Sequence, residues 1–446
     1  MEKSLFNYFA KYVSLNVLGM IGLSCYILAD TYFVAQALGA TGLAALNISI
    51  PIFSFTSGIG LMLGIGGATR FSILISRNQM HQADEVLATS VKLGLIIGLL
   101  FVLVGIFGSK PLAMLFGADQ STLPLAQVYL RTILVFAPFF MLNNIITTFV
   151  RNDQNPNLSM IAMLVGSFSN ILLDYVFMFP LGMGIFGAAF ATCLAPIISL
   201  LILQVHYWKK FAGFKFLGNK IRWSIVGDLC SLGVSALVNE LSSGIVLIAF
   251  NLIILGIAGN IGVAAYGIVA NLALLVIAIF TGVAQGIQPL TSKYYGLTEY
   301  QTGRKIFQYA LWTALLLAGL IYLVVFLYSA EIISMFNSEN NRLIGEIAGI
   351  GLRIYFLGFF FAGINIVAAI YLSTIEEARA AFVLSIARGV AILLPFVYVL
   401  SKLWQMTGVW LAFVITELLV TLIAYYLIRV SHRQLCFQKV SPLRKQ

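Results

Sequence analysis

The sequence predicts an all-α integral membrane protein with twelve transmembrane helices in two pseudo-symmetric six-helix lobes. Three observations predict this fold class: the composition, a series of long apolar segments, and an internal repeat. Of the 446 residues, 61% are hydrophobic and 9% are charged, whereas about a quarter of the residues of soluble domains are charged. This composition excludes a water-soluble globular protein.

Twelve apolar segments are long enough to cross the hydrocarbon core of a bilayer, which requires about 20 residues of helix. The first of these segments carries a single charge, that of Asp30. Prolines inside several segments are tolerated as kinks, because neighbouring helices satisfy the freed backbone groups. The predicted spans are residues 12–38, 46–69, 88–108, 128–150, 158–180, 184–206, 229–257, 263–290, 305–328, 349–373, 380–400 and 408–430.

Lysine and arginine are distributed unevenly between the loops. If the N-terminus is cytoplasmic, twelve spans return the C-terminus to the same side. The cytoplasmic loops and tails then hold 20 of the 26 Lys and Arg residues, the outer side holds 5, and Arg388 lies within a span. Positive residues accumulate in cytoplasmic loops, so we expect a multi-pass protein of the inner or plasma membrane with both termini in the cytoplasm. The net charge of +10 then reflects topology, and we expect no nucleic-acid partner.

The last six spans repeat the first six. Residues 39–45 align with residues 259–265 at an offset of 220, and after two inserted residues 130–131 align with 352–353. Duplicated halves around a shared cavity are typical of secondary transporters. The expected organisation is an N-terminal lobe at residues 1–212, a cytoplasmic linker at 213–223 and a C-terminal lobe at 224–446.

The two halves differ in their intramembrane polar residues. Asp30 corresponds to Phe250 in the second half, and Asp174 corresponds to Phe396. An ionised carboxylate inside a span costs at least about 2.5–3.5 kcal/mol, so such residues are usually paired or functional. We therefore interpret Asp30 as the residue that binds a transported ion or proton. The alternative is that its carboxylate caps a helix or packs against neighbouring polar side chains.

Four of these residues lie at a similar depth. Asp30, Asp174 and Thr192 are 8, 6 and 8 residues from the outer ends of their spans, or about 9–12 Å at helical rise. Asn170 is one helical turn from Asp174 on the same face. Their oxygens suit a proton or Na⁺ but are too few for a dedicated Ca²⁺ site. We predict a cation site at Asp30, Asn170, Asp174 and Thr192 and no other metal site.

Three motifs carry a resemblance to a known family: Asp30-Thr-Tyr-Phe-Val in the first span, Asn170-Ile-Leu-Leu-Asp174 in the fifth, and Gly187-Ala-Ala-Phe-Ala-Thr192 in the sixth. In order and spacing they resemble the multidrug and toxic compound extrusion family over nearly the whole chain. The resemblance implies that these four polar residues bind H⁺ or Na⁺, and that cationic, amphipathic compounds leave through a cavity between lobes.

Some branches of that family use a Glu in the seventh span and an Asp in the tenth. Glu240 matches the first of these, but the residues around Asn365 offer no carboxylate for the second. Glu240 either attracts a cationic substrate or pairs with a neighbouring hydroxyl. Arg388 and Glu417 are expected to pair, since an unpaired Arg inside a membrane is costly. The residues expected to line the substrate cavity are Tyr32, Phe139, Met141, Asn143, Met163, Met178 and Glu240.

Antiport of organic cations and amphipathic drugs against H⁺ or Na⁺ by alternating access is the favoured function. The alternative is a flippase or exporter of a lipid-linked or polysaccharide precursor from the same superfamily. The sequence contains no HExxH motif and no Ser–His or Cys–His candidate set, so we do not expect an enzyme. We expect no cofactor apart from the coupling ion, and a monomer whose partners are small organic cations and membrane lipids.

Overall fold

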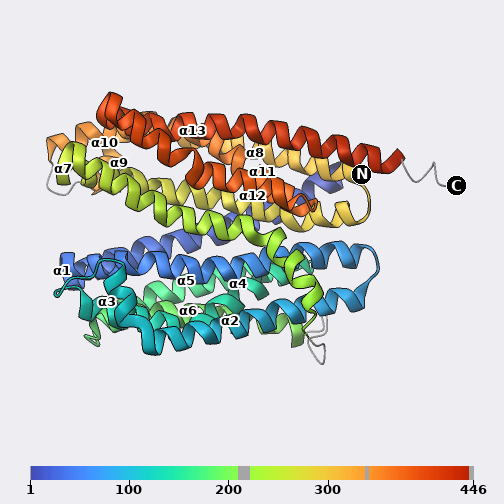
Figure 1. Ribbon diagram of the computed structural model, residues 1–446, viewed down its shortest axis with the longest axis horizontal. Helices are drawn as coiled ribbons and strands as arrows, with labels where there is room; N and C mark the ends of the chain where they lie inside the picture. The colour runs from blue at the N-terminus through green and yellow to red at the C-terminus, as the bar shows by residue number, and fades with distance from the viewer. Residues whose placement is uncertain (1, 209–220, 337–340, 441–446) are drawn as a thin grey trace. The chain divides into compact units, whose positions relative to one another are not determined.

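A computed structural model describes residues 2–208, 221–336 and 341–440, and within these ranges the chain forms helices and turns but no strand (Figure 1). The helices follow one another as long, mostly apolar rods joined by short turns. They are α1 (Glu2–Ser76), α2 (Met80–Leu115), α3 (Leu123–Val135), α4 (Ala137–Asn152), α5 (Pro156–Met178), α6 (Gly184–Trp208), α7 (Trp223–Gly296), α8 (Tyr300–Leu327), α9 (Ser329–Phe336), α10 (Arg342–Tyr355), the 3₁₀ turn η1 (Phe356–Gly358), α11 (Phe359–Thr374), α12 (Ala378–Ile386), the π-helical turn η2 (Ala387–Ala391) and α13 (Leu393–Val440).

The helix α1 reverses direction at Gly39, which has φ 63° and ψ −153°. A Cβ atom placed on Gly42 would lie 3.3 Å from Cγ1 of Val34, eight residues earlier. Eight residues of straight helix would instead rise about 12 Å. The two arms of α1 therefore form a hairpin, and the helix crosses the membrane twice.

The helices α7 and α13 reverse in the same way. Gly259 in α7 has φ 60° and ψ −156°, and Gln405 in α13 has φ 49° and ψ −130°. Nine segments of the described chain are long and apolar enough to span a membrane when the bent pair α3–α4 counts as one. Since three of the nine contain a reversal, nine plus three gives the twelve predicted spans.

The repeat is visible in the backbone. Asn78 and Thr298 are equivalent at the repeat offset, and both have φ 59°. Gln154 and Glu376 are equivalent once the two inserted residues are included, and they have φ 64° and 61°. Positive φ is uncommon for residues other than glycine, so its recurrence at both pairs of positions confirms the internal duplication and the insertion within it.

The fourth and tenth spans are both interrupted at equivalent positions. The helices α3 and α4 are bent by 50° at Phe136, and Pro138 occupies the first turn of α4, where proline is tolerated. Beyond the insertion in the repeat, Phe136 corresponds to Gly358, which ends η1 between α10 and α11. The second break therefore occurs without a proline.

By internal contacts the chain divides into two compact units. One comprises Ser14–Gly244, here called the N unit, and the other comprises Met1–Val13 with Ile245–Gln446, here called the C unit. The predicted linker at 213–223 lies, apart from its last three residues, outside the described residues. The predicted lobe boundaries follow the sequence repeat, which the contact units do not test, and they stay a prediction.

Close helix crossings within the two units also obey the repeat. In the N unit a Cβ atom on Gly66 of α1 would lie 2.9 Å from the backbone nitrogen of Gly233 of α7. In the C unit a Cβ atom on Gly286 of α7 would lie 2.8 Å from Cα of Val13 of α1. The repeat offset relates Gly66 to Gly286 and Val13 to Gly233, so each long helix crosses its counterpart through a glycine that allows backbones to approach.

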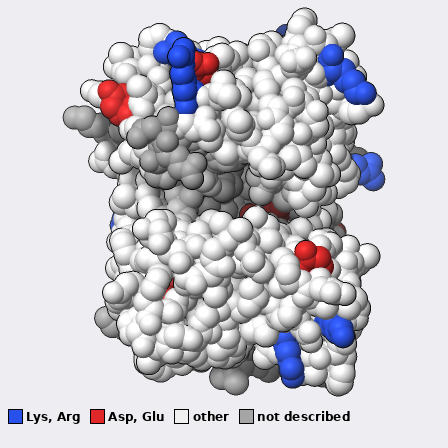
Figure 2. All heavy atoms as spheres, turned by 90° about the vertical axis from the view of Figure 1, so that its left-hand side faces the viewer, with Lys and Arg blue, Asp and Glu red and all other residues white. Residues whose placement is uncertain are grey.

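Figure 2 shows one face of the chain, on which most of the described atoms belong to uncharged residues. The visible Lys, Arg, Asp and Glu side chains are scattered and are not gathered into one basic or acidic patch. This face agrees with a chain in which 9% of the residues are charged.

Candidate cation-binding site

The four residues of the predicted cation site lie on three helices of the N unit, and all are buried. Asp30 lies on the first arm of α1 and is 7% exposed, while Asn170 and Asp174 on α5 are 0% exposed and Thr192 on α6 is 5% exposed. Asp30 precedes the reversal at Gly39 by nine residues, which is about 13 Å of helix. The site therefore lies inside the helical unit, away from its ends.

The amide of Asn170 joins the helices α5 and α6. In the orientation that satisfies both neighbours, its Nδ2 donates to Oδ2 of Asp174 at 3.0 Å and its Oδ1 accepts from the backbone N–H of Thr192 at 3.2 Å. With the amide turned over, Nδ2 donates instead to Oγ1 of Thr192 at 3.4 Å. The structure thus brings three of the four predicted residues into direct contact.

The two carboxylates each retain an oxygen without a hydrogen-bond partner among the described residues. These atoms are Oδ1 of Asp30 and Oδ1 of Asp174, and both are buried. The charge of Asp30 also acts on Asp174. Buried polar atoms are nearly always paired, and two nearby carboxylates disfavour the state in which both are ionised. A proton on one of the two carboxylates, or a small cation bound by the unpartnered oxygens, fits this arrangement.

Two tyrosines of the site were not identified from the sequence. Tyr26 lies one turn before Asp30 on α1, and Tyr129 on α3 is 5% exposed. The charges of both Asp30 and Asp174 act on each of these phenols. The i, i−4 spacing from Asp30 could have indicated Tyr26, but nothing in the periodicity of α3 places Tyr129 beside the carboxylates.

The equivalent region of the C unit is apolar. Phe250, which corresponds to Asp30, is 0% exposed and stacks on Tyr266 with ring centroids 5.4 Å apart. Its aromatic packing fills the position that the carboxylate occupies in the N unit.

The residues predicted for the substrate cavity separate into two groups. Tyr32 and Phe139 are exposed, at 59% and 39%. Met141 and Met178 are 0% and 4% exposed and belong to two closed hydrophobic clusters of the N unit. In this conformation the two methionines pack against other side chains, as most core methionines do.

Glu240, Met163 and Asn143 are half-buried. The Cβ atom of Glu240 lies 3.2 Å from where a Cβ atom on Gly58 would be, and the charge of Glu240 acts on Tyr26. Tyr26 is therefore under the influence of three carboxylates of the N unit, one of them from the predicted cavity and two from the cation site.

In the C unit the predicted pair is confirmed. Nε of Arg388 donates to Oε1 of Glu417 at 2.7 Å.

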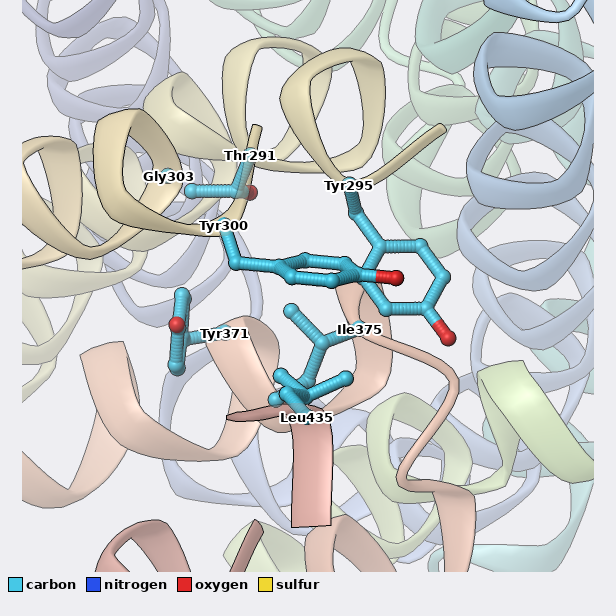
Figure 3. Close-up of a pocket in the computed structure, with 7 residues that line it drawn as sticks. All are labelled: Thr291, Tyr295, Tyr300, Gly303, Tyr371, Ile375 and Leu435. Atoms are coloured by element: carbon cyan, nitrogen blue, oxygen red, sulfur yellow. The ribbon is translucent and has the colours of Figure 1, made fainter. Parts of the chain in front are cut away.

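A small crevice elsewhere in the C unit is bordered by three tyrosines, Tyr295, Tyr300 and Tyr371 (Figure 3). Its volume is about 10 Å³, room for about one water molecule and far below the roughly 300–1,000 Å³ of sites for drug-sized ligands. None of the residues predicted for the cation site or the substrate cavity lines it.

Two stretches of the chain, residues 17–176 and 236–399, match the family model MatE, and together they cover more than half of it. The chain belongs to the MatE family. The two matched stretches begin at positions 17 and 236, nearly the spacing of the internal repeat. Members of the MatE family are transporters, so this MatE protein is a transporter and not an enzyme.

Curated relatives match nearly the full length of this MatE chain. The multidrug export protein MepA of Staphylococcus saprophyticus is 26% identical over 420 residues, which are 94% of this chain and 92% of the relative. MepA of Staphylococcus aureus strain MSSA476 is 25% identical over 409 residues, 90% of this chain and 89% of the relative.

Solved structures of MATE transporters share the fold. An outward-facing multidrug-resistance MATE transporter of the MOP superfamily superposes with a TM-score of 0.91 at 23% identity, covering 96% of both chains. A point mutant of VcmN, a MATE transporter from Vibrio cholerae, superposes with a TM-score of 0.89 at 20% identity, covering 97% of this chain and 98% of that chain. These likenesses support the twelve-helix fold of this MatE protein.

Proposed function

We propose that this protein is a secondary transporter that exports organic cations and amphipathic drugs in exchange for H⁺ or Na⁺. The observation that carries the proposal is the buried pair Asp30 and Asp174, whose Oδ1 atoms have no hydrogen-bond partner among the described residues. Two carboxylates in a membrane protein without a fixed counter-ion need a mobile one. A coupling ion that comes and goes with each cycle would supply it.

The contacts of α1 indicate how the site could respond to its ion. A Cβ atom on Gly19 would lie 3.0 Å from Sδ of Met163, and one on Gly22 would lie 2.6 Å from Cδ2 of Leu164. The helix α1 therefore packs closely against α5 just before Asp30. Neutralising the carboxylates removes the free-energy cost of closing these helices around a charge, so ion binding would favour a closed N unit with reduced attraction for an organic cation.

Two further observations support this direction of transport. The MepA relatives are multidrug export proteins by name. The 20 Lys and Arg residues assigned to one side of the membrane, against 5 on the other, favour cytoplasmic termini. We propose that the protein is a monomer of the inner or plasma membrane that takes its cargo from the cytoplasm or the inner leaflet.

Flipping of an anionic lipid-linked precursor is the second candidate for this fold, but the intramembrane charges do not favour it. A pyrophosphate group calls for several cationic side chains. Four acidic residues, Asp30, Asp174, Glu240 and Glu417, lie within the spans, and Arg388, which lies deep within a span, is already paired with Glu417.

Dye efflux from proteoliposomes tests the proposed function. Purified protein is reconstituted, loaded with the cationic dye rhodamine 123, and given either a pH gradient or a Na⁺ gradient, one at a time. We expect dye movement against its gradient under one of the two conditions, and none in liposomes without protein. Movement that is equal with and without either ion gradient would contradict coupled antiport.

A further inference from the structure

The pair Arg388–Glu417 lies deep in the C unit and has no role in the cation site. Arg388 is ten residues after the start of α12 at Ala378 and sixteen before the break at Trp404. These separations are about 15 Å and 24 Å of helix. The side chain of Glu417 is 2% exposed and that of Arg388 is 16% exposed.

Glu417 is held by more than Arg388. Nδ2 of Asn365 donates to Oε2 of Glu417 at 2.7 Å and to its backbone carbonyl at 2.9 Å. The hydroxyl of Thr421 donates to Oδ1 of Asn365 at 3.1 Å, which fixes the orientation of the amide. Each carboxylate oxygen of Glu417 accepts a hydrogen bond, whereas Asp30 and Asp174 each keep an oxygen without a partner among the described residues.

Arg388 uses only part of its guanidinium in this arrangement. Nε donates to Glu417 at 2.7 Å. Nη1 and Nη2 make no hydrogen bond within the described residues, and neither is among the buried atoms that lack a partner, so both remain accessible. The pair of terminal nitrogens forms a planar fork whose geometry matches a carboxylate.

The fold does not require charges at this helix crossing. Beyond the insertion in the repeat, Arg388 corresponds to Gly166. After a one-residue slip at Gly184 and Gln405, which both have positive φ, Glu417 corresponds to Pro196, next to Ala195. In the N unit a Cβ atom on Gly166 would lie 3.2 Å from the carbonyl oxygen of Ala195, so there the two helices meet backbone to backbone. The same crossing in the C unit carries an ion pair and widens into the π-helical turn η2 around Arg388. Such turns occur frequently at functional sites.

The open edge of Arg388 must face water or a polar ligand. A charged group at this depth is costly in hydrocarbon, and intramembrane Arg residues almost always face the protein interior or a water-filled space. Glu417 holds the guanidinium by Nε and thereby leaves the terminal nitrogens free for another partner. A single guanidinium that is already paired suits one carboxylate better than a pyrophosphate.

We propose that the free edge of Arg388 binds a carboxylate of the cargo, so that the preferred substrates are amphipathic organic cations that also carry a carboxylate group. This inference rests on the proposed export function and adds a substrate class to it. Glu417, Asn365 and Thr421 act as positioning residues, because they hold the guanidinium and are not directed at the ligand.

Two xanthene dyes with the same fused-ring cation test the proposal. Rhodamine 123 carries a methyl ester, and rhodamine 110 carries the free carboxylate in its place. Binding of each dye to purified protein is measured by fluorescence polarisation. The variant is Arg388→Gln combined with Glu417→Gln, which leaves no unpaired buried charge. We expect the Kd of rhodamine 110 to rise about tenfold or more, as loss of a charge-assisted hydrogen bond predicts, and that of rhodamine 123 to change less than about threefold.

Arg353→Gln serves as the matched control, because Arg353 lies elsewhere in the C unit, over the ring of Phe326, and should change neither affinity. If the double variant is not monodisperse, Arg388→Lys decides the question. This substitution keeps the positive charge but loses the planar fork. It should therefore weaken the binding of rhodamine 110 and leave the binding of rhodamine 123 unchanged.

Equal weakening of both dyes, or unchanged binding of rhodamine 110, would overturn the role of Arg388 while leaving the export function in place. If the unmodified protein bound neither dye, both proposals would fall.

Discussion

Asn170 and Asp174 lie one turn apart on α5, with Nδ2 of the first 3.0 Å from Oδ2 of the second. This contact leaves Oδ1 of Asp174 free of hydrogen bonds among the described residues. The amide therefore orients the carboxylate without neutralising it. A site that must bind and release a cation needs both properties.

Replacing Asn170 with Ala should impair transport without unfolding the protein. The substitution removes the donor to Asp174 and the acceptor for the backbone of Thr192, so we expect gradient-driven dye efflux to fall about fivefold or more. Leu172→Ala is the matched control on the same helix, because Leu172 is 63% exposed. Equal losses of efflux in the two variants would mean that any change in this helix impairs transport, and that the contacts of Asn170 have no specific role.

Asp30→Asn should keep the fold and abolish coupling. Asn has the shape of Asp but cannot exchange a proton at neutral pH, and it removes the charge that acts on Asp174. We expect a monodisperse protein with thermal stability equal to or above that of the parent, since a buried charge is removed. Rhodamine 123 efflux driven by the ion gradient should drop to the level of protein-free liposomes. Near-normal efflux driven by the ion gradient in this variant would contradict the proposed role of Asp30.

The crossing of α1 and α7 in the N unit should tolerate no side chain at Gly233. A Cβ atom there would lie 2.6 Å from the carbonyl carbon of Met62, and overpacking of this kind costs about 1–3 kcal/mol. We expect Gly233→Ala to lower the thermal unfolding midpoint by several degrees. Gly244→Ala on the same helix meets nothing within 4 Å and should leave the midpoint unchanged or raise it. The reverse order of the two variants would refute this account of the crossing.

Gly39→Ala tests the reversal of α1 separately from packing. A Cβ atom on Gly39 meets nothing within 4 Å, so steric overlap plays no part. The backbone angles of φ 63° and ψ −153° are nearly confined to glycine, and holding another residue there costs about 1–3 kcal/mol. We expect lower thermal stability for Gly39→Ala. The control is Gly227→Ala, which also has open surroundings but lies in an ordinary helical segment. If both variants had the same stability, the reversal would not depend on glycine.

Much of the fold could be predicted from the sequence, because each span is a long apolar segment and the repeat fixes their order. The sequence did not reveal that the chain reverses at Gly39 and Gln405 with almost no loop, since apolar residues continue on both sides of the turns. The π-helical turn at Ala387–Ala391 was equally invisible, because the helix around it is apolar and the positions on either side of it keep the same repeat offset, as Gln154–Glu376 and Asp174–Phe396 show.

The site residues were predictable where charge made them conspicuous. A carboxylate in an apolar span is rare enough to be noticed, and one-turn spacing then identified Asn170. The rotation of each helix about its axis is not encoded in a span that is apolar on every face. For this reason the position of Tyr129 beside the carboxylates was missed, and Met141 and Met178 were expected at a cavity but pack in closed clusters.

The pH dependence of substrate affinity tests the central claim, that the carboxylates of Asp30 and Asp174 serve both the coupling ion and the attraction of the cationic cargo. The Kd of rhodamine 123 is measured by fluorescence polarisation in detergent from acidic to alkaline pH, for the unmodified protein and for Asp30→Asn. Protons and cargo are linked reciprocally, so we predict an affinity that weakens as the pH falls, by about two- to tenfold per pH unit where the pair titrates, and a flatter slope in Asp30→Asn. An affinity independent of pH in the unmodified protein, or an unchanged slope in the variant, would contradict the account.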